Sequence, residues 1–286
     1  MDGFLIIDKE KGYTSFDVCN KIKHKFHISH VGHTGTLDPN ATGVLVVSLG
    51  RACKTLNMLE EKSKTYLCEV EFGISYDTID PCGKVLSESY KEITLKEINK
   101  AIDVLKTQDK QLPPKYSALK VNGKRAYDLA RSGKEFELKE RDVKIFDIKV
   151  VSDLEKKNDR FYIAILLKVS KGFYVRSFVR DLASLLEADA NMYNLRRLES
   201  GVFNIKDSKK IDEIEESDLM SISKAFEYLP RVEFKPYLEK MIKNGIALDE
   251  RNVKIDTPFV ACVNNEEIAI YNITEEKYKY KFEAFI

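Results

Sequence analysis

The stretch Gly32-His33-Thr34-Gly35-Thr36-Leu37-Asp38-Pro39-Asn40-Ala41-Thr42-Gly43 places one carboxylate, that of Asp38, between glycines and a proline. Glycine permits backbone angles that other residues resist, whereas Pro39 fixes its own φ and favours an extended Asp38. The β-branched run at 44–47 follows at once and predicts a buried strand that anchors the loop to the core. These residues alone leave two interpretations: Asp38 caps a backbone amide in an Asp-Pro turn, or it is held rigid for chemistry.

The composition is typical of a globular protein with a sizeable core. The 286 residues are 43% hydrophobic, and 47 Lys and Arg face 46 Asp and Glu, so whole-chain charge indicates no polyanionic partner. Residues 110–144 nevertheless hold ten Lys or Arg against five Asp or Glu, with Tyr116 and Tyr127 among them. A basic stretch with aromatic residues suits RNA, although a solvated surface loop can have the same composition.

The cysteines and the N terminus indicate the compartment. The five cysteines are odd in number, widely spaced and without a C-x-x-C pair, which argues against disulfides and against a thiolate zinc site. No basic region precedes a long apolar run, and no stretch approaches the length of a membrane span. We therefore expect a reduced, cytoplasmic protein without a membrane segment.

Hydrophobic spacing predicts the elements that surround the Asp38 loop. A strand at 4–7 precedes a helix that begins at the N-cap Ser15, and a second helix is predicted over 51–59. Alternation over 65–72 predicts a half-buried strand with Tyr66 on its inner face. The residues expected on the buried faces are Phe16, Cys19, Ile22 and Phe26 in the first helix, and Tyr66, Cys68, Val70 and Phe72 in the strand.

Strands and helices alternate irregularly in the middle of the chain. Thr94 and Glu97 form a capping box before an amphipathic helix, and an apolar strand covers 161–169. A helix follows from Arg176, with Phe178, Leu182 and Leu185 expected on its buried face. No G-x-G-x-x-G follows a strand, so the pattern favours an α+β fold with a mixed sheet over a dinucleotide-binding fold.

A separate small domain is expected after Pro230. A helix at 237–243 and short strands around Val260, Ile268 and Phe282 indicate a β-rich unit. We therefore predict a domain over 1–230, with a basic insertion at about 110–144, and a second domain over 231–286.

The four histidines do not predict a metal site. His24, His27, His30 and His33 are three residues apart, but Gly32 ends any helix there and no carboxylate lies at ligand spacing. His33 precedes the Asp38 loop directly, and its imidazole could contact nucleic acid or stabilise the loop. We expect no metal.

Asp38 has two candidate partners. A carboxylate in a constrained loop can attack an electrophilic carbon if a cation orients it and an aromatic neighbour excludes water. Arg176, at a strand-to-helix corner, could supply the cation, and Tyr66 could supply the aromatic ring.

Four motifs, in order along the chain, resemble the signatures of the bacterial tRNA pseudouridine-55 synthases of the TruB family. Their agreement in order is far more specific than any single motif. They are Gly32 to Gly43, Lys115-Tyr116-Ser117-Ala118-Leu119-Lys120-Val121-Asn122-Gly123-Lys124-Arg125, Lys171-Gly172-Phe173-Tyr174-Val175-Arg176-Ser177 and Leu195-Arg196-Arg197-Leu198.

The resemblance implies a fold and an activity. The implied fold is the pseudouridine-synthase α+β fold, a mixed and largely antiparallel sheet flanked by helices, with a short C-terminal domain that resembles the RNA-binding PUA domain. The implied reaction isomerises uridine-55 in the T-loop of tRNA to pseudouridine without cofactor or metal. The implied partner is the tRNA T-arm. We expect the protein to be a monomer.

The resemblance also implies roles for single residues. Asp38 matches the essential aspartate, which attacks the sugar C1′ or the base C6 or promotes glycal formation, and the sequence leaves these three routes open. Arg176 matches the arginine that pairs with it, as an ion pair that keeps the carboxylate ionised. Tyr66 matches the tyrosine that stacks on the target base, which must leave the RNA stack to reach it.

Further matches concern binding. Lys9 matches an active-site lysine, and His33 matches the histidine that inserts where the flipped base was. Leu195 or Leu198 falls where an apolar residue packs the uracil. The basic stretch with Lys120, Lys124 and Arg125 resembles a flexible insertion that grips the T-arm backbone. This chain departs from the family at Glu10, at Cys53 and in the 77–83 segment, outside the matched catalytic positions.

Two other functions remain open from the sequence. The first is an RNA-binding or tRNA-folding protein whose isomerase activity is incidental or lost. The second is a glycoside-type hydrolase, which usually needs two carboxylates beside the scissile bond, so Asp77 or Asp80 would have to supply the partner of Asp38.

Overall fold

The computed structural model describes residues 1–60, 63–121 and 123–286, and contacts between Cα atoms divide the chain into two compact units. The first unit comprises Met1–Asp38, Leu45–Glu60 and Lys206–Ile286, and the second comprises Pro39–Val44 and Glu61–Ile205. The chain therefore leaves the first unit directly after Asp38. Asn122, part of the second sequence motif, lies outside the described residues, and the domain boundary at residue 230 stays a prediction.

The first unit begins with a strand, a helix and a hairpin. β2 pairs antiparallel with β3, from Val31 opposite Leu49 to Thr34 opposite Val46, so the strand predicted at 44–47 is confirmed. The elements up to the second unit are β1 (Gly3–Lys9), α1 (Ser15–Lys25), β2 (Val31–Thr34), β3 (Thr42–Leu49), the 3-10 helix η1 (Gly50–Thr55) and α2 (Leu56–Glu60).

The start of α1 differs from the prediction. The N-cap is Thr14, whose hydroxyl accepts from the amide of Asp17 at 3.0 Å while the Asp17 carboxylate accepts from the Thr14 amide at 2.9 Å. Ser15 is the first helical residue, and its hydroxyl is used elsewhere. The buried stripe consists of residues 15, 18, 19 and 22. Phe16 lies one position off that stripe and is 67% exposed, so its predicted burial was wrong.

The second unit is built on antiparallel strands in the order β14-β4-β13-β11. The first residues of β3 pair with β14 in parallel, so the predicted mixed, largely antiparallel sheet is confirmed. The strands are β4 (Lys64–Phe72), β5 (Ile74–Tyr76), β6 (Val85–Glu88), β7 (Lys110–Gln111), β8 (Lys120–Val121), β9 (Lys124–Arg125), β10 (Arg141–Asp142), β11 (Ile145–Val150), β12 (Glu155–Lys157), β13 (Arg160–Val169), β14 (Ala190–Ser200) and β15 (Phe203–Asn204).

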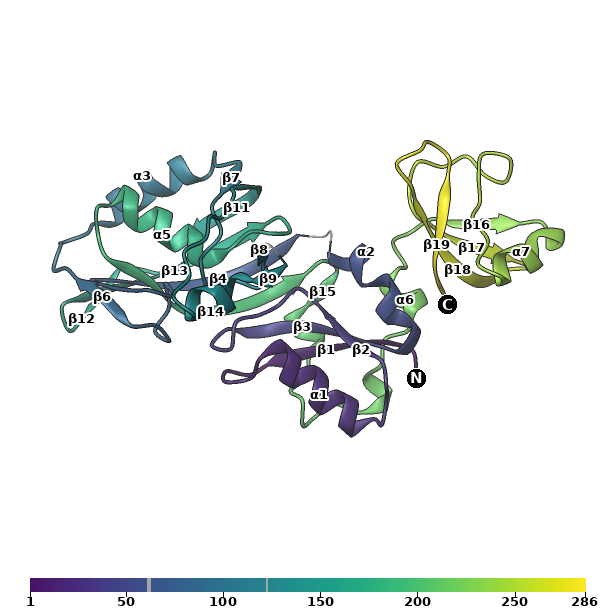
Figure 1. Cartoon of the computed structure of the whole chain (residues 1–286), viewed down its shortest axis with the longest axis horizontal. Helices are drawn as coiled ribbons and strands as arrows, with labels where there is room; N and C mark the ends of the chain where they lie inside the picture. The colour runs from purple at the N-terminus through teal and green to yellow at the C-terminus, as the bar shows by residue number, and fades with distance from the viewer. Residues whose placement is uncertain (61–62, 122) are drawn as a thin grey trace. The chain divides into compact units, whose positions relative to one another are not determined.

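The helices of the second unit are α3 (Leu95–Leu105), α4 (Ala126–Arg131) and α5 (Val175–Leu185). Figure 1 shows α3 and α5 on one side of the sheet. The inner face of β4 is buried as predicted, at Tyr66, Cys68, Val70 and Phe72. The capping box of Thr94 and Glu97 is confirmed. Leu185, however, is 47% exposed, because the buried stripe of α5 continues through Leu182 to Leu186 and Leu185 lies one position off it.

The last part of the first unit contains a four-stranded sheet with its own core, drawn in green and yellow in Figure 1. Its aromatic centre stacks Phe259 on Tyr271, with ring centroids 5.6 Å apart, and sets Tyr280 edge-on to Phe259. The elements of this segment are η2 (Ile205–Asp207), η3 (Glu216–Asp218), α6 (Ile222–Ala225), β16 (Arg231–Phe234), η4 (Pro236–Leu238), α7 (Glu239–Lys243), β17 (Phe259–Val263), β18 (Glu266–Ile273) and β19 (Tyr280–Phe285). The predicted β-rich C-terminal segment is therefore confirmed.

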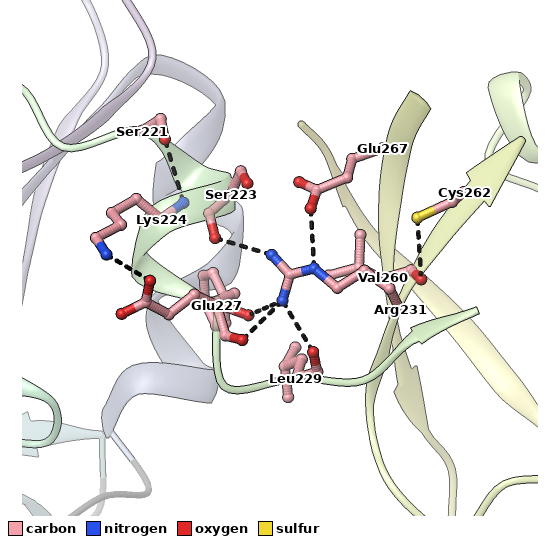
Figure 2. A network of polar contacts seen from close by, with 10 residues as sticks. Ser221, Ser223, Lys224, Glu227, Leu229, Arg231, Val260, Cys262 and Glu267 are labelled. Carbon is pink, nitrogen blue, oxygen red and sulfur yellow. Dashed lines mark hydrogen bonds and ion pairs between the residues drawn. The ribbon is translucent and has the colours of Figure 1, made fainter. Parts of the chain in front are cut away.

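Arg231 joins the C-terminal sheet to the turn after α6 (Figure 2). Its Nη1 donates to the carbonyl oxygens of Phe226, Glu227 and Leu229 at 2.8 to 3.0 Å, and its Nε donates to the Glu267 carboxylate of β18 at 2.9 Å. These carbonyls belong to a tight turn whose acceptors would otherwise need water. One guanidinium thus holds the turn and the sheet together.

We expect Arg231→Met to lower the free energy of unfolding by about 2 kcal/mol, because several carbonyl oxygens and one carboxylate lose a charged donor. The free energy of unfolding is measured by urea denaturation. Limited proteolysis should in addition cleave the variant faster than the wild-type protein between residues 226 and 235. Lys235→Met is the control, since the Lys235 side chain makes no polar contact within the described residues. Equal stability of the two variants would contradict the role of the Arg231 contacts.

Candidate functional site

The Asp38 loop is fixed from the helix side. The Ser15 hydroxyl accepts from the Leu37 amide at 2.9 Å and lies 3.3 Å from the Leu37 carbonyl oxygen. Leu37 itself is 3% exposed. Gly35, with φ +61°, takes the turn out of β2, which a residue with a Cβ resists. The loop that carries Asp38 is therefore anchored immediately before the carboxylate, and Asp38 is half-buried.

Lys9 and His33 belong to the same unit as Asp38. Lys9 ends β1 with a side chain 1% exposed, and its ammonium donates to the carbonyl oxygens of Tyr13 at 2.7 Å and Glu10 at 3.1 Å. These carbonyls belong to the turn before α1, so the lysine ties the strand to the helix start. His33 lies on β2 opposite Val47 and is half-buried.

Tyr66 and Leu195 share one face of the sheet in the second unit. Tyr66 pairs with Arg197 of β14, and Leu195 pairs with Cys68 two residues along β4. Paired residues of antiparallel strands point to the same face, as do residues two apart on one strand. Tyr66 and Leu195 are both 8% exposed. The structure thus brings these two predicted residues together.

Leu198 is placed differently from Leu195. The register between β14 and β4 shifts between Arg197 and Glu199, so Leu198 is the extra residue of a bulge. Its face cannot be deduced from strand alternation, and it is half-buried. Of the two leucines proposed to pack the uracil, Leu195 is the one that shares the face of Tyr66.

Arg176 lies in the first turn of α5 and is 7% exposed. Its Nη2 donates to the Tyr116 carbonyl oxygen at 2.9 Å, and its Nη1 donates to the Thr78 carbonyl oxygen at 3.3 Å. The Tyr116 hydroxyl donates to the Asp77 carboxylate at 3.3 Å. Burial, and then the charge of Asp77, raise the pKa of Tyr116. Arg176 is therefore held by the second sequence motif and by the 77–83 segment.

The start of the basic insertion is fixed by the start of α5. The Gln111 side chain accepts from the Tyr174 amide at 2.8 Å, and the Leu112 carbonyl oxygen accepts from the Ser177 hydroxyl at 2.8 Å. The short strands β7 and β10 pair and close the base of the insertion. The helix that carries Arg176 thus also holds the entry of the insertion.

The insertion exposes its positive charge. All ten Lys and Arg between residues 110 and 144 are exposed, and none of them forms an ion pair with any residue that the structure describes. Lys120 and Arg125 face each other in the hairpin of β8 and β9, and Lys124 lies beside them. These three predicted residues are therefore brought together as one exposed basic group.

The partners of Arg176 could not be recognised in the sequence. The acceptors are main-chain carbonyls of Thr78 and Tyr116, and a carbonyl carries no residue signature. Arg197, which is buried next to Tyr66, also had no role assigned to it, although it lies within the fourth sequence motif. The pairing of Asp38 with Arg176 stays a prediction.

The cysteines and the possible metal ligands of the described residues were compared with the predictions. All five cysteines are free thiols, and burial raises the pKa of Cys19 to about 12 and also raises the pKa of Cys68 and Cys262. Within the described ranges, no group of three or more His, Cys, Asp or Glu could hold a metal ion. None of the helices that the structure describes has the length and apolar character to cross a membrane.

The chain is similar in sequence to known proteins of one family. Residues 23–175 match the N-terminal domain of the TruB family of pseudouridylate synthases. A tRNA pseudouridine synthase B from Ureaplasma urealyticum is 46% identical over 211 residues, which cover 73% of this chain and 91% of the relative. The protein of the same name from Acholeplasma laidlawii is 35% identical over 285 residues, which cover 99% of both chains.

Solved structures share the fold. A chain of a Cbf5-Nop10-Gar1 complex aligns with a TM-score of 0.69 and 22% identity, covering 99% of this chain and 83% of that one. A chain of an H/ACA RNP bound to a substrate RNA containing 2′-deoxyuridine aligns with a TM-score of 0.67 and 20% identity, with the same coverage. The predicted fold is confirmed, and the chain belongs to the TruB family of pseudouridylate synthases.

Proposed function

We propose that this protein is a tRNA pseudouridine synthase that isomerises uridine-55 in the T-loop. The observation that carries the proposal is the match with the Acholeplasma laidlawii tRNA pseudouridine synthase B over 99% of both chains. The matched motifs supply a carboxylate in an anchored loop and a buried arginine at a helix start, and the separately matched Tyr66 lies on a buried sheet face. Their chemistry suits a reaction on one flipped base.

In the proposed reaction, the N1–C1′ bond of the target uridine breaks and C1′ bonds to C5 of the same uracil. C5 then loses its proton to solvent, and N1 takes up a proton. Substrate and product have the same atoms and oxidation state, so the conversion needs no redox cofactor. Asp38 supplies the ionised carboxylate and Arg176 the cation that keeps it ionised. Tyr66 stacks on the base and Leu195 packs the uracil, while Lys9 is the active-site lysine and His33 fills the gap in the RNA.

The exposed insertion is the proposed grip on the T-arm. Its Lys and Arg side chains have no protein carboxylate partner among the described residues, so each can neutralise a phosphate without breaking an ion pair. In residues 231–286, by contrast, nine Lys and Arg face ten Asp and Glu. Several of them are already paired, including Lys243 with Glu239 and Lys281 with Glu283.

The proposal also concerns the compartment, the oligomeric state and the metal dependence of the protein. We propose a cytoplasmic monomer that works without metal. The free thiols support a reducing compartment. Activity that survives dialysis against EDTA and a monomer mass in solution are the expected results.

We expect Lys120→Gln with Lys124→Gln to reduce the slope of log affinity against log salt by about 1.5, since each lost phosphate contact removes about 0.7 to 0.9. The measurement is the Kd for tRNA at several salt concentrations. The control replaces Lys243 and Lys279, which pair with Glu239 and Glu276, and should leave the slope unchanged. Equal slopes for both double variants would contradict the grip.

Tritium release from T-arm RNA labelled at uracil C5 tests the activity. The expected result is release by the wild-type protein and one pseudouridine at position 55. Free uracil among the products would indicate a hydrolase. Tight binding without release would indicate an RNA-binding protein that lacks the isomerase activity.

A further inference from the structure

Arg197 is a buried guanidinium in β14 to which the motif comparison gives no role. Its side chain is 1% exposed and is among the largest fully buried side chains of the described residues. Burial of an ionised group costs free energy that apolar side chains of similar volume do not cost. Such a residue contributes little to stability for its volume. We therefore look for its role in the groups that its planar donors bind.

The Arg197 guanidinium holds the strand that follows the Asp38 loop. Its Nε donates to the carbonyl oxygen of Val44 at 2.7 Å. Val44 lies six positions after Asp38 in the chain. A short directed bond from a fixed donor therefore ties the exit of the loop to β14, while the hydroxyl of Ser15 ties its entry at Leu37.

Gly43 shows how closely the two strands approach. In the parallel pairing of β3 with β14, Gly43 lies opposite Arg197. Gly43 has φ +101°, and a Cβ built there would lie 2.2 Å from the Arg197 carbonyl oxygen. Only glycine fits this position, so the exit of the loop lies directly against the main chain of Arg197.

Arg197 also neighbours the proposed stacking residue. It pairs with Tyr66 across β14 and β4, so both side chains point to the same face of the sheet. Arg197 thus contacts two segments at once: the strand after the aspartate loop, and the strand of the tyrosine. The two segments are far apart in sequence and carry different parts of the proposed site.

We propose that Arg197 is a positioning residue for the isomerisation. By binding the Val44 carbonyl from a position beside Tyr66, it fixes the exit of the Asp38 loop relative to the strand that presents the base-stacking ring. The inference rests on the proposed function. Displacement of a reacting group by about 1 Å can reduce a rate about 100-fold, so the effect falls on the chemical step.

The test separates rate from affinity and from stability. For Arg197→Gln we expect single-turnover tritium release to fall about 100-fold at a temperature where the variant is folded, with the Kd for tRNA within about threefold of wild type. Lys168→Gln is the control, since Lys168 is exposed on β13, the strand on the other side of β4 from β14. It should keep a rate within about threefold of wild type.

If Arg197→Gln does not fold, Arg197→Lys tests whether Arg197 is a positioning residue. It keeps the buried charge and one donor but loses the planar geometry, so we expect a rate about tenfold below wild type with unchanged Kd. A wild-type rate in either folded variant, or a loss confined to affinity or to unfolding temperature, overturns the proposal. An inactive wild-type protein in the same assay would instead refute the proposed function.

Discussion

Asp38→Asn is expected to lower the rate of pseudouridine formation by about 10⁴-fold or more, the scale on which enzymes lose activity without their nucleophile. The amide has almost the same volume as the carboxylate and can keep the loop conformation, because Ser15 anchors the loop through Leu37 and not through Asp38. It cannot, however, supply the negative charge that each of the three routes open to Asp38 requires. The measurements are the single-turnover rate of tritium release and the Kd for tRNA.

Affinity should survive in Asp38→Asn, because in the proposed complex the exposed insertion and not the aspartate supplies the phosphate contacts. The Kd for tRNA should remain within about threefold of wild type. Asp212→Asn, at an exposed position of the same unit, is the control and should have wild-type turnover. Retained turnover in Asp38→Asn would refute the assignment of the catalytic residue.

Arg176→Lys is expected to reduce turnover by about 100-fold or more. The wild-type guanidinium donates to the carbonyl oxygens of Tyr116 and Thr78 through two different nitrogens. A lysine at this 7% exposed position has one ammonium and no planar fork, so it cannot serve both carbonyls and also orient a carboxylate. The measurement is the rate of tritium release at saturating tRNA.

Arg180→Lys, one turn further along α5, is the matched control for Arg176→Lys. The Arg180 guanidinium donates to the Asp181 carboxylate and to the Leu112 carbonyl oxygen, and its side chain is 35% exposed. We expect this variant to keep most of its turnover. If both variants lose turnover equally, the effect comes from the start of the insertion and not from the Arg176 cation.

Periodicity predicted most elements, and its errors have a common cause. The strands at 65–72 and 161–169 and the capping box of Thr94 are confirmed, because alternation and capping are local properties. Phe16 and Leu185 were expected to be buried, and both lie one position off the buried stripe of a helix. Which positions at the border of such a stripe are buried depends on the packing of the helix against its neighbours, and hydrophobic spacing does not reveal that packing. The segment 51–59 starts as a 3-10 helix, which hydrophobic spacing does not distinguish from an α-helix.

The candidate site was predictable to the extent that it consists of side chains. Tyr66 was expected on the inner face of its strand, and its burial confirms the phase. The support around it was not predictable, because it consists of main-chain carbonyls and of long-range strand pairing. The bond from Arg197 to Val44 joins residues 153 positions apart, and only the fold brings them together.

In the proposed complex, the positive charge of the insertion, which no described carboxylate pairs, limits how long the protein stays on the wrong RNA. The insertion has a surplus of five positive charges, ten minus five, whereas the chain as a whole has a net charge of +1. Non-specific attraction to RNA grows with the number of phosphates that are neutralised together, and it weakens steeply with salt. A surplus confined to one arm holds only a short run of backbone. If the insertion grips RNA as proposed, the protein releases wrong RNA molecules quickly, and long residence requires a base that enters the site.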